Sequence, residues 1–358
     1  MVNNLNPKVG WGRMALKVAE SFIEKGHEVG FITEKKVSEK TPPRLTVPLR
    51  TPSLNNFLRL PFILTRIRSF IKSYDFVLCY DVNPNAIILN LANLGQKRKI
   101  VIHALATYSL LGHGTPLRNL LMRWAYRRAK NIFVVSEFTK REIEKSGFKL
   151  DKYVVVPVGV DTNYFHPILL EEKILAYPFI LTVGALKHRK GYHVSIPAFG
   201  LIAKEFPDLK YIVIGSQGLI DYYGKLKNIV AELGLNDRVI FLEKISDEEI
   251  LKYYNSAELF LMISTTDPDS VEGFGMVYLE AGACGIPVVG AYNTGAEAAI
   301  VDNVTGFLVK PDPISVANAM RKILSDRGLA KKMGEEGIGR AKEFDWFRVS
   351  ELYLKHLK

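Results

Sequence analysis

The sequence predicts an α/β protein with two Rossmann-like domains, each built on a doubly wound parallel sheet. Short β-branched runs without polar alternation recur along the chain, as expected for strands that are buried on both faces. Segments with helical periodicity separate these runs, and this alternation is typical of parallel βα units. The length of 358 residues exceeds that of a usual single domain, so we expect two domains.

The expected strands form two groups along the chain. A helical segment at residues 12–26 precedes the first group, whose strands are expected at residues 27–33, 75–81, 99–105, 131–136 and 153–159. The strands of the second group are expected at residues 179–185, 210–216, 238–244, 259–264, 286–292 and 305–309. Each half therefore has enough strands for a sheet of its own.

Residues 159–178 join the two halves and have the mixed polarity and the two prolines that are typical of a domain linker. We assign residues 1–165 to an N-terminal domain and residues 166–344 to a C-terminal domain. The last segment, about residues 345–358, is predicted to be a helix that packs back on the N-terminal domain. Parallel sheets bind ligands beyond the carboxyl ends of their strands, so two facing sheets imply a central cleft with one ligand on each wall.

Composition indicates the cellular setting. The two cysteines, Cys79 and Cys284, lie in apolar segments of different halves, as reduced core thiols do. No apolar run is long enough to span a membrane, and the first ten residues lack the apolar segment of a secretion signal. We therefore expect a cytoplasmic protein that is neither integral to a membrane nor exported by that route.

The positive charge of the chain lies entirely in its first half. Residues 1–160 contain 26 Lys and Arg against 11 Asp and Glu, a net charge of +15, whereas residues 161–358 contain 22 against 26, a net charge of −4. Such asymmetry indicates that one domain faces an anionic partner, which is a membrane, a nucleic acid or an acidic substrate. A solvated basic surface without a partner is an equally good interpretation.

Residues 271–290 place two glutamates in an apolar run. Glu272 is expected in the turn after the strand at residues 259–264, and Glu280 is expected inside the following helix, which is apolar on every side. A buried carboxylate without partners costs several kcal/mol, so Glu280 requires hydrogen-bond donors. The paired hydroxyls of a ribose are one candidate, and a buried salt bridge to a neighbouring strand is the other. Gly273 and Gly275 let backbone amides at the helix start approach an anion or a hydroxyl oxygen.

The chain resembles the retaining glycosyltransferases of family 4, which share the two-domain GT-B fold and a motif of two glutamates with seven residues between them. The segments that carry the resemblance follow one another in the family's order: GWGRMALKVAESFIEKGHEV, NIFVVSEFTKREIEKSG, VVVPVGVDTNYFHP, ILTVGALKHRKG, VEGFGMVYLEAGACGIPVV, NTGAEAAIVDNVTGFLV and FDW. Each motif alone is a weak signal. Together they cover nearly the whole chain and make a strong one.

The resemblance implies a donor site in the C-terminal domain. Glu280 would hold the ribose hydroxyls of a sugar nucleotide, Glu272 would hold the transferred sugar, and Lys190 would neutralise the diphosphate. A fixed cation and helix-start amides stabilise the charge that develops on the leaving diphosphate, so neither a metal nor another cofactor is expected. The expected substrate-binding residues are Gly10, Gly12, Gly184, Arg189, Lys190, Gly273, Phe274, Gly275, Met276 and Glu280.

The resemblance also implies roles for residues of the first half. Gly10 and Gly12 match a glycine-rich turn before a helix, which approaches the donor phosphate or the acceptor. His103 matches a histidine near the reacting centre, so we treat His103 and Glu272 as the catalytic candidates. A satisfied structural histidine is the alternative for His103. Retention would proceed by front-face attack, in which the leaving phosphate helps to remove the acceptor proton.

Three positions depart from the family pattern. Ala185 replaces an arginine that is common in the family, and we expect Arg189 rather than Lys187 to compensate because a guanidinium holds two phosphate oxygens at once. Glu243 stands where a glycine is common, in the region that approaches the nucleobase. The first strand, residues 1–5, is short and polar.

The resemblance predicts transfer of a hexose from a nucleotide-diphosphate sugar to a hydroxyl of a saccharide or lipid-linked acceptor in envelope glycan or glycolipid synthesis. Helical stripes in residues 61–72 and 116–130 carry both apolar and basic side chains, as helices in a membrane interface do. We expect peripheral contact with an anionic membrane, on the inner face of the cell membrane. Stripes that face the domain core are the alternative for both helices.

Two other classes of function remain open at this point. The glycines at positions 10 and 12, followed by Glu34, also fit the fingerprint of an NAD-dependent enzyme. The charge asymmetry also fits a non-enzymatic adaptor for membrane or nucleic acid. Aromatic residues are not interleaved with the basic ones, which disfavours nucleic acid.

Overall fold

The computed structural model describes residues 1–2, 5, 10–34, 44–47, 58–105, 109–110, 115–170, 174–266 and 270–357. The chain divides into two compact units. Unit 1 comprises Met1–Gly159 together with Trp346–Lys358, and unit 2 comprises Val160–Asp345. The boundary thus falls earlier than the residue 165 expected from the linker composition, and the C-terminal helix belongs to unit 1.

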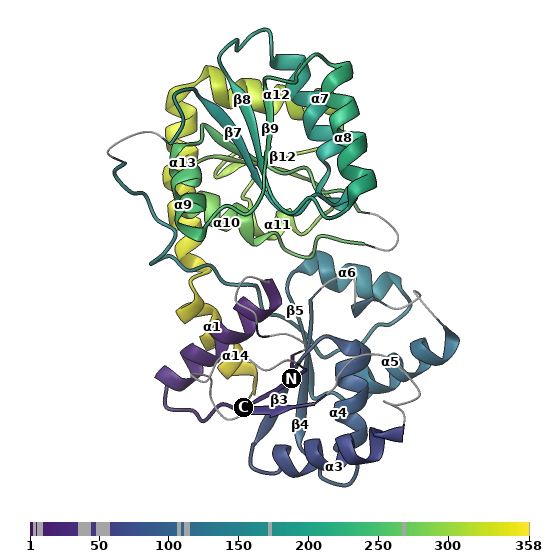
Figure 1. The fold of residues 1–358 in the computed structure, drawn as a ribbon. Helices are drawn as coiled ribbons and strands as arrows, with labels where there is room; N and C mark the ends of the chain where they lie inside the picture. The colour runs from purple at the N-terminus through teal and green to yellow at the C-terminus, as the bar shows by residue number, and fades with distance from the viewer. Residues whose placement is uncertain are drawn as a thin grey trace. The chain divides into compact units, whose positions relative to one another are not determined.

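Unit 2 contains a six-stranded parallel sheet in the order β12-β11-β10-β7-β8-β9 (Figure 1). Its strands are β7 Phe179–Val183, β8 Lys210–Ile214, β9 Val239–Leu242, β10 Leu259–Leu261, β11 Val288–Ala291 and β12 Gly306–Val309. Its helices are α7 Tyr192–Ile202, α8 Ile220–Glu232, α9 Asp247–Ser256, α10 Met276–Ala283, α11 Ala296–Ala299, α12 Pro313–Ser325 and α13 Arg327–Glu343, with the 3₁₀ turn η3 at His188–Lys190. Most residues of these strands are buried, and only the edge strand β9 is largely half-buried, which confirms the prediction of a parallel sheet covered on both faces.

The strand order of unit 2 reverses between β7 and β10. The chain runs outward from β7 through β8 to β9 and then returns to the other side of β7 with β10, β11 and β12. The loops that leave β7 and β10 at their carboxyl ends therefore start side by side and lead to strands on opposite sides of this point. A crevice at such a switch point is where open parallel sheets bind ligands.

Unit 1 contains the parallel sheet β3-β4-β5-β6 and the parallel pair β1-β2. Its strands are β1 Phe31–Thr33, β2 Arg44–Thr46, β3 Phe76–Tyr80, β4 Lys99–Ala104, β5 Asn131–Val134 and β6 Tyr153–Val155. Its helices are α1 Gly10–Glu24, α3 Leu60–Ile71, α4 Ile87–Ala92, α5 Pro116–Arg128, α6 Glu137–Lys145 and α14 Trp346–Leu357, with the π-helical turn η1 at Val82–Ala86. All five strands expected in this half are therefore present, although shorter than the apolar runs that predicted them.

Met1 and Val2 lie between the two groups of strands in unit 1. The amide of Val2 donates to the carbonyl of Ile32 at 3.0 Å, and the amide of Tyr80 donates to the carbonyl of Met1 at 2.9 Å. These bonds join β1 to β3 through a short extended segment. The expected strand at residues 1–5 is thus represented by Met1 and Val2, while residues 3–4 lie outside the described part of the chain.

The C-terminal helix α14 packs on unit 1 through one apolar face, which includes Trp346, Val349 and Tyr353. Its last turn receives a hydrogen bond of 2.8 Å from the side-chain amide of Asn131 to the carbonyl of His356. A side chain at Gly159 would overlap the indole of Trp346, so glycine is required where the chain leaves unit 1. Among the described helices, none is long and apolar enough to cross a membrane.

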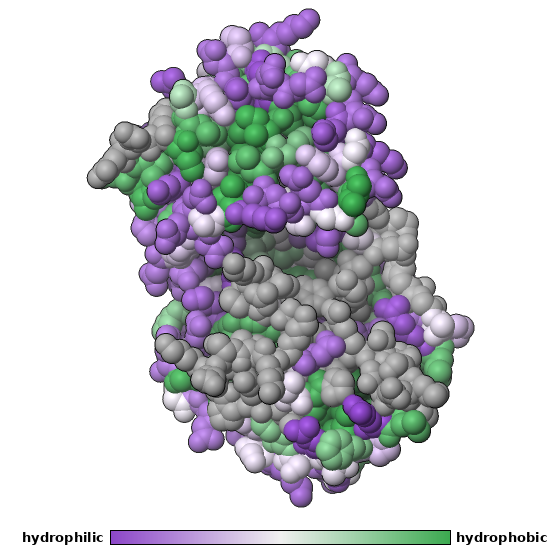
Figure 2. Space-filling view, in the orientation of Figure 1, coloured by the Kyte–Doolittle hydropathy of each residue, from purple (hydrophilic) through white to green (hydrophobic). Residues whose placement is uncertain are grey.

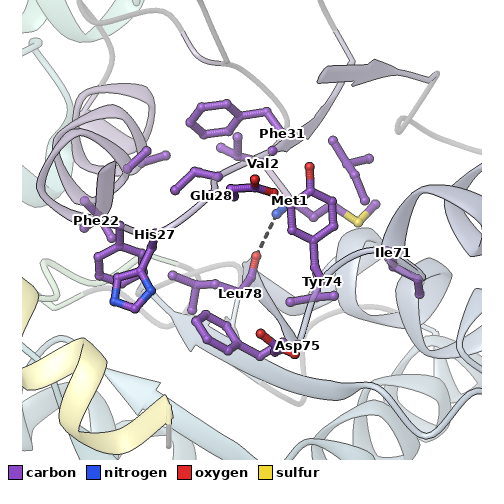
Figure 3. Close-up of a pocket in the computed structure, with 18 of the residues that line it drawn as sticks. Met1, Val2, Phe22, His27, Glu28, Phe31, Ile71, Tyr74, Asp75 and Leu78 are labelled. Carbon is purple, nitrogen blue, oxygen red and sulfur yellow. Dashed lines mark hydrogen bonds between the residues drawn. The ribbon is translucent and has the colours of Figure 1, made fainter. Parts of the chain in front are cut away.

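A cavity of about 360 Å³ lies in unit 1 at the amino ends of β1 and β3. Figure 3 shows Phe22, His27 and Glu28 on one side of it and Tyr74 and Asp75 on another. Parallel sheets present their functional loops at the opposite, carboxyl edge. None of the candidate site residues lines this cavity.

Candidate functional site

The loops after β7 and β10 meet at the switch point of unit 2. The loop after β7 contains η3, whose Arg189 carbonyl accepts a hydrogen bond of 2.9 Å from the amide of Thr265 beyond β10. Gly191 ends this turn with φ +69°, and a side chain there would overlap the carbonyl of Ile263. Glycine is therefore required for the close approach that holds Arg189 and Lys190 over the end of β10.

The loop after β10 is held in place by the turn after β11. The amide of Gly295 donates to the carbonyl of Glu272 at 2.8 Å, and a side chain at Gly295 would overlap the backbone of Gly273. Gly275 then caps α10 in the left-handed region, with φ +83°. These contacts fix the backbone on both sides of Phe274, whose ring is buried.

Glu272 pairs with both cations of the opposite loop. Its Oε2 lies 2.7 Å from the Nζ of Lys190 and also accepts a hydrogen bond from the Nη1 of Arg189. Burial opposes ionisation of Glu272, but Lys190 and Arg189 outweigh it and hold the pKa of the carboxyl below its ordinary value. Burial lowers the pKa of the Lys190 ammonium, and Glu272 opposes that effect. The cluster thus carries two cations for one anion, in a site of low exposure.

Gly184 borders this cluster at the end of β7. Its carbonyl accepts a hydrogen bond of 2.6 Å from the hydroxyl of Tyr192, and its amide donates to Ile214 at 2.8 Å. The Cε of Lys190 lies 3.6 Å from the position that a side chain at Gly184 would occupy. Of the residues predicted from the sequence, the structure therefore brings together Gly184, Arg189, Lys190 and Glu272.

Glu280 lies on α10, which begins at Met276, and is 8% exposed. Its Oε2 accepts a hydrogen bond of 3.0 Å from the hydroxyl of Tyr254 on α9. Tyr254 is fully buried, and its ring contacts Phe165 and Phe260. One partner of Glu280 is thus a tyrosine hydroxyl.

No motif or spacing in the sequence pointed to Tyr254. It lies inside α9 among other aromatic and polar residues, and only the packing of α9 against α10 brings it to Glu280. The apolar residues around Glu280 indicated only that this carboxylate needs a buried hydrogen-bond donor, and they did not identify the donor.

The residues predicted in unit 1 are placed differently from the expectation. Gly10 and Gly12 lie in the first turn of α1, not in a turn before it, because the helix begins at Gly10. His103 is fully buried inside β4, where its Nδ1 lies 2.9 Å from the hydroxyl of Tyr353. Burial lowers the pKa of His103 to about 3, so the ring is neutral. This burial favours the structural alternative for His103 over a role at the reacting centre.

Asp81 is a residue of unit 1 that the sequence analysis missed. It follows β3 directly, is buried, and has φ 73° and ψ 155°, a conformation that residues other than glycine rarely adopt. The hydroxyl of Ser109 donates to its Oδ1 at 2.8 Å. Burial raises the pKa of Asp81 to about 7, although the bond from Ser109 opposes this effect. Asp81 is the last residue of the strand expected at residues 75–81, and functional residues of parallel sheets gather at this carboxyl end, so its position was a signal.

Two family models match the chain. The model described as Glycosyltransferase Family 4 matches residues 10–164, and the model described as Glycosyl transferases group 1 matches residues 171–340. The two matches together span most of both units. They favour a glycosyltransferase over the NAD-dependent enzyme and the adaptor.

Several curated relatives are glycosyltransferases. The chain is 28% identical over 294 residues to the GDP-mannose-dependent alpha-(1-6)-phosphatidylinositol monomannoside mannosyltransferase of Mycolicibacterium smegmatis. This alignment covers 77% of this chain and 75% of that protein. The chain is also 27% identical over 319 residues to the N-acetylgalactosamine-N,N'-diacetylbacillosaminyl-diphospho-undecaprenol 4-alpha-N-acetylgalactosaminyltransferase of Campylobacter jejuni, covering 87% and 84%. A D-inositol 3-phosphate glycosyltransferase of Paenarthrobacter aurescens is 32% identical over 219 residues, 58% of this chain and about half, 52%, of that relative's length.

Solved structures share the fold. A glycosyltransferase of Rickettsia africae aligns with a TM-score of 0.82 at 22% identity and covers 98% of this chain and 95% of that one. HepE of Anabaena, in complex with UDP and glucose, aligns with a TM-score of 0.80 at 20% identity and covers 99% and 97%. At these identities the likeness concerns the fold alone.

The ion-pair cluster predicts opposite effects for the two glutamates on binding of a nucleoside diphosphate. Glu272→Gln removes the anion that competes for Arg189 and Lys190, so affinity should rise by about three- to tenfold. Glu280→Gln weakens the contact expected to the ribose and should reduce affinity by about 1 to 3 kcal/mol. Titration calorimetry with UDP, GDP and ADP measures both.

Inorganic pyrophosphate is the control ligand, because it has no ribose. Glu272→Gln should bind it more tightly than the wild type does, and Glu280→Gln should bind it equally well. Weaker diphosphate binding by Glu272→Gln would contradict competition for the cations, and unchanged binding by Glu280→Gln would remove the ribose role.

The same cluster predicts which cations of the loop after β7 are required. Arg189→Ala and Lys190→Ala should each reduce turnover by about tenfold or more, equivalent to roughly 1.4 kcal/mol of transition-state stabilisation. Lys187→Ala is the matched control, since that side chain is exposed and should contribute little. Initial rates of sugar transfer separate the three variants. A fully active Arg189→Ala protein would show that Arg189 does not compensate for Ala185.

Asp81 predicts a pH dependence of stability. Its pKa is raised from 3.8 to about 7 in the folded state, so its contribution to stability is present below pH 3.8 and is lost as the pH rises to 7. Asp81→Asn should remove this loss, which amounts to at most about 4 kcal/mol. Urea unfolding between pH 4 and 8 measures the difference. Asp75→Asn, at an exposed position before the same strand, should keep the pH dependence of the wild type.

Proposed function

Because this chain belongs to glycosyltransferase family 4 and has the GT-B fold, we propose that it transfers a hexose from a nucleotide-diphosphate sugar with retention of configuration and without a metal. The observation that supports this best is the cluster of Arg189, Lys190 and Glu272 at the switch point of unit 2. The excess of cations in this cluster favours a diphosphate. A carboxylate in the same cluster favours the hydroxyls of a sugar attached to it.

The cluster accounts for stabilisation of the leaving group. As the bond between the anomeric carbon and the phosphate oxygen breaks, negative charge develops on the diphosphate. Lys190 and Arg189 lie in a partly buried site, where their charges are less screened than on the surface. Two fixed cations supply the charge that a divalent metal supplies in other enzymes, and this supports transfer without a metal.

Displacement of Glu272 from the cations couples donor binding to sugar recognition. When the diphosphate takes the cations, the carboxylate of Glu272 becomes an acceptor for hydroxyls of the transferred sugar. Backbone amides from Gly273 to Met276 lie next to it and complete the donor pocket in this proposal. Glu280, buried one turn further along α10, would receive the ribose hydroxyls in addition to the Tyr254 bond.

Retention follows in this proposal from attack on the face that the leaving group occupies. The acceptor oxygen forms a bond to the anomeric carbon as the phosphate departs, and the acceptor proton passes to the departing phosphate oxygen. In this proposal His103 does not take this proton, because its ring is buried in β4 and burial lowers its pKa, which makes it a weak base. It supports β4 and α14 through its bond to Tyr353 instead.

The acceptor is proposed to be a saccharide or a lipid-linked saccharide of envelope glycan or glycolipid synthesis. The mycobacterial relative is named for a phosphatidylinositol mannoside and the Campylobacter relative for a diphospho-undecaprenol acceptor. An acceptor of this kind is embedded in a membrane, so the protein is proposed to work from the cytoplasmic side as a peripheral membrane enzyme. The net charge of +15 on residues 1–160 supports contact with anionic lipid.

Donor binding and metal independence are tested together. A panel of UDP, GDP, ADP and their hexose conjugates should include one nucleotide that stabilises the protein by about 2.7 kcal/mol at a hundredfold excess over its Kd. Transfer should continue in EDTA, and nuclear magnetic resonance of the product should show the anomeric configuration of the donor. The Arg189→Ala, Lys190→Ala double variant is the control and should lose the thermal shift. Loss of activity in EDTA, or an inverted product, would contradict the proposal.

A further inference from the structure

Glu243 places a carboxylate at the same sheet edge as the candidate site. The strands β7, β8 and β9 are adjacent and end in register, and Gly184, Gly215 and Glu243 are the first residues beyond them. Neighbouring strands lie about 4.8 Å apart, so the backbone of Glu243 lies about 10 Å from that of Gly184. The edge strand β9 is apolar and mostly half-buried, and Figure 2 shows hydrophobic residues on the face of unit 2 where Figure 1 draws it. The exposed Glu243 ends this apolar edge with a negative charge.

Glycines form the sheet edge between the cation cluster and Glu243. Main-chain hydrogen bonds of 2.8 and 2.9 Å hold Gly184 against β8 and Gly215 against β9. A side chain at Gly215 would overlap the carbonyl of Gly184, so glycine is required there. The edge therefore has no side chain at these two positions. An elongated ligand that is held at one end by Lys190 can lie along this edge towards Glu243.

The carboxylate of Glu243 is held in place while most of its capacity as an acceptor remains available. Its Oε1 accepts a hydrogen bond of 3.0 Å from the amide of Gln217, in the loop after β8. In the part of the chain that the structure describes, no Lys or Arg forms an ion pair with Glu243. A carboxylate offers about four lone pairs, so Oε2 and one lone pair of Oε1 can accept further hydrogen bonds.

Helix α9 connects Glu243 with the residue expected to hold the ribose. The helix follows the loop that Glu243 begins, and Ser246 and Glu249 close its first turn with a capping box. Further along the same helix, Tyr254 donates to Glu280. In a nucleotide the ribose joins the diphosphate to the base. A base that extends from a ribose at Glu280 along the sheet edge reaches the loop after β9.

A carboxylate distinguishes the nucleobases by the hydrogen-bond donors on their edges. Guanine presents two adjacent donors, N1–H and the 2-amino group, which one carboxylate can accept together in charge-assisted hydrogen bonds. Uracil presents a single N–H between two carbonyl oxygens, which a carboxylate repels. Adenine presents its amino group beside an acceptor nitrogen. Guanine is therefore the base whose edge matches Glu243 best.

We propose that Glu243 recognises the base of the donor and selects guanine, so that the donor is a GDP-sugar. This rests on the proposed function, because it concerns the nucleotide that is assigned there to unit 2. The charge of Glu243 contributes to the selection in two ways. It strengthens the hydrogen bonds from guanine, and it weakens binding of any anionic nucleotide whose base donates nothing to it.

Titration calorimetry with four nucleoside diphosphates tests the selection of the base. Inosine diphosphate is the most informative ligand, because it differs from GDP only in lacking the 2-amino group. The wild type should bind GDP at least about tenfold more tightly than the inosine, uridine or adenosine diphosphate, equivalent to roughly 1.4 kcal/mol. Equal binding of GDP and inosine diphosphate, or binding of UDP or ADP as tight as that of GDP, would overturn the proposal.

The variant Glu243→Gln tests whether this side chain is responsible. The glutamine keeps an oxygen for the amide of Gln217 but replaces the other acceptor by an NH₂ donor. It should bind GDP and inosine diphosphate equally, and it should bind xanthosine diphosphate at least about fivefold more tightly than the wild type does, because the 2-carbonyl of xanthine accepts from this donor. Glu243→Gln with the preferences of the wild type would contradict the assignment.

Glu248→Gln is the matched control, since Glu248 is an exposed carboxylate in the first turn of α9. It should keep the preference of the wild type for GDP. Loss of the preference in this variant to the same extent would show that the general charge of the region is responsible, and the assignment to Glu243 would fail. Both variants should bind inorganic pyrophosphate as the wild type does, because neither change touches Arg189 or Lys190.

The same titrations separate this proposal from the proposed function. Preferred binding of UDP or ADP, with sugar transfer from that donor, would overturn the selection of guanine and leave the proposed function intact. Absence of binding by every nucleoside diphosphate would contradict the proposed function, and the selection of guanine would fail with it. Preferred binding of GDP that depends on Glu243, with transfer from a GDP-sugar, is the expected result.

Discussion

The contact between the loops after β7 and β10 is the constraint on which the candidate site depends. Both loops leave the sheet where its strand order reverses, and Gly191 lets them approach until Glu272 reaches Arg189 and Lys190. Removing ions from water is costly unless each has a partner, and Glu272 serves as the partner of both cations. One positive charge remains in excess. An anionic ligand can therefore replace Glu272 without leaving a buried cation unpaired.

Glycines are required where the backbones of different loops meet around this cluster. Gly191 lies against Ile263, and Gly295 lies against Gly273. At both positions a side chain would overlap the neighbouring backbone. The close approach of the backbones keeps the loops, and thus the charged side chains that they carry, in fixed positions. A preorganised cation stabilises developing charge without the cost of reorganisation during the reaction. The glycines thus serve the electrostatics of the site although they carry no chemistry themselves.

Much of the fold and part of the site could be predicted from the sequence. Unalternating apolar runs indicated buried parallel strands, the two carboxylates in the apolar run at residues 271–290 pointed to Glu272 and Glu280, and the family resemblance pointed to Lys190. The pairing of Glu280 with Tyr254 could not be predicted, because it depends on how α9 packs against α10. The environment of His103 was equally hidden: its partner Tyr353 is 250 positions away in a helix that returns to unit 1. Periodicity reports which face of an element is buried, but it does not report which distant residue covers it.

The two units distribute charge in ways that act over different distances. Residues 161–358, most of which belong to unit 2, carry a net negative charge. The candidate site of unit 2 nevertheless concentrates two cations, and burial strengthens their interactions with nearby groups and reduces screening by salt. The positive charge of unit 1 is spread over exposed side chains, so its field extends into solvent and weakens as salt is added. A small diphosphate requires only the local field of a desolvated pair. An extended anionic surface requires the summed field of many exposed cations. The charge asymmetry along the chain is therefore compatible with a small anionic ligand in unit 2 and an extended anionic surface at unit 1.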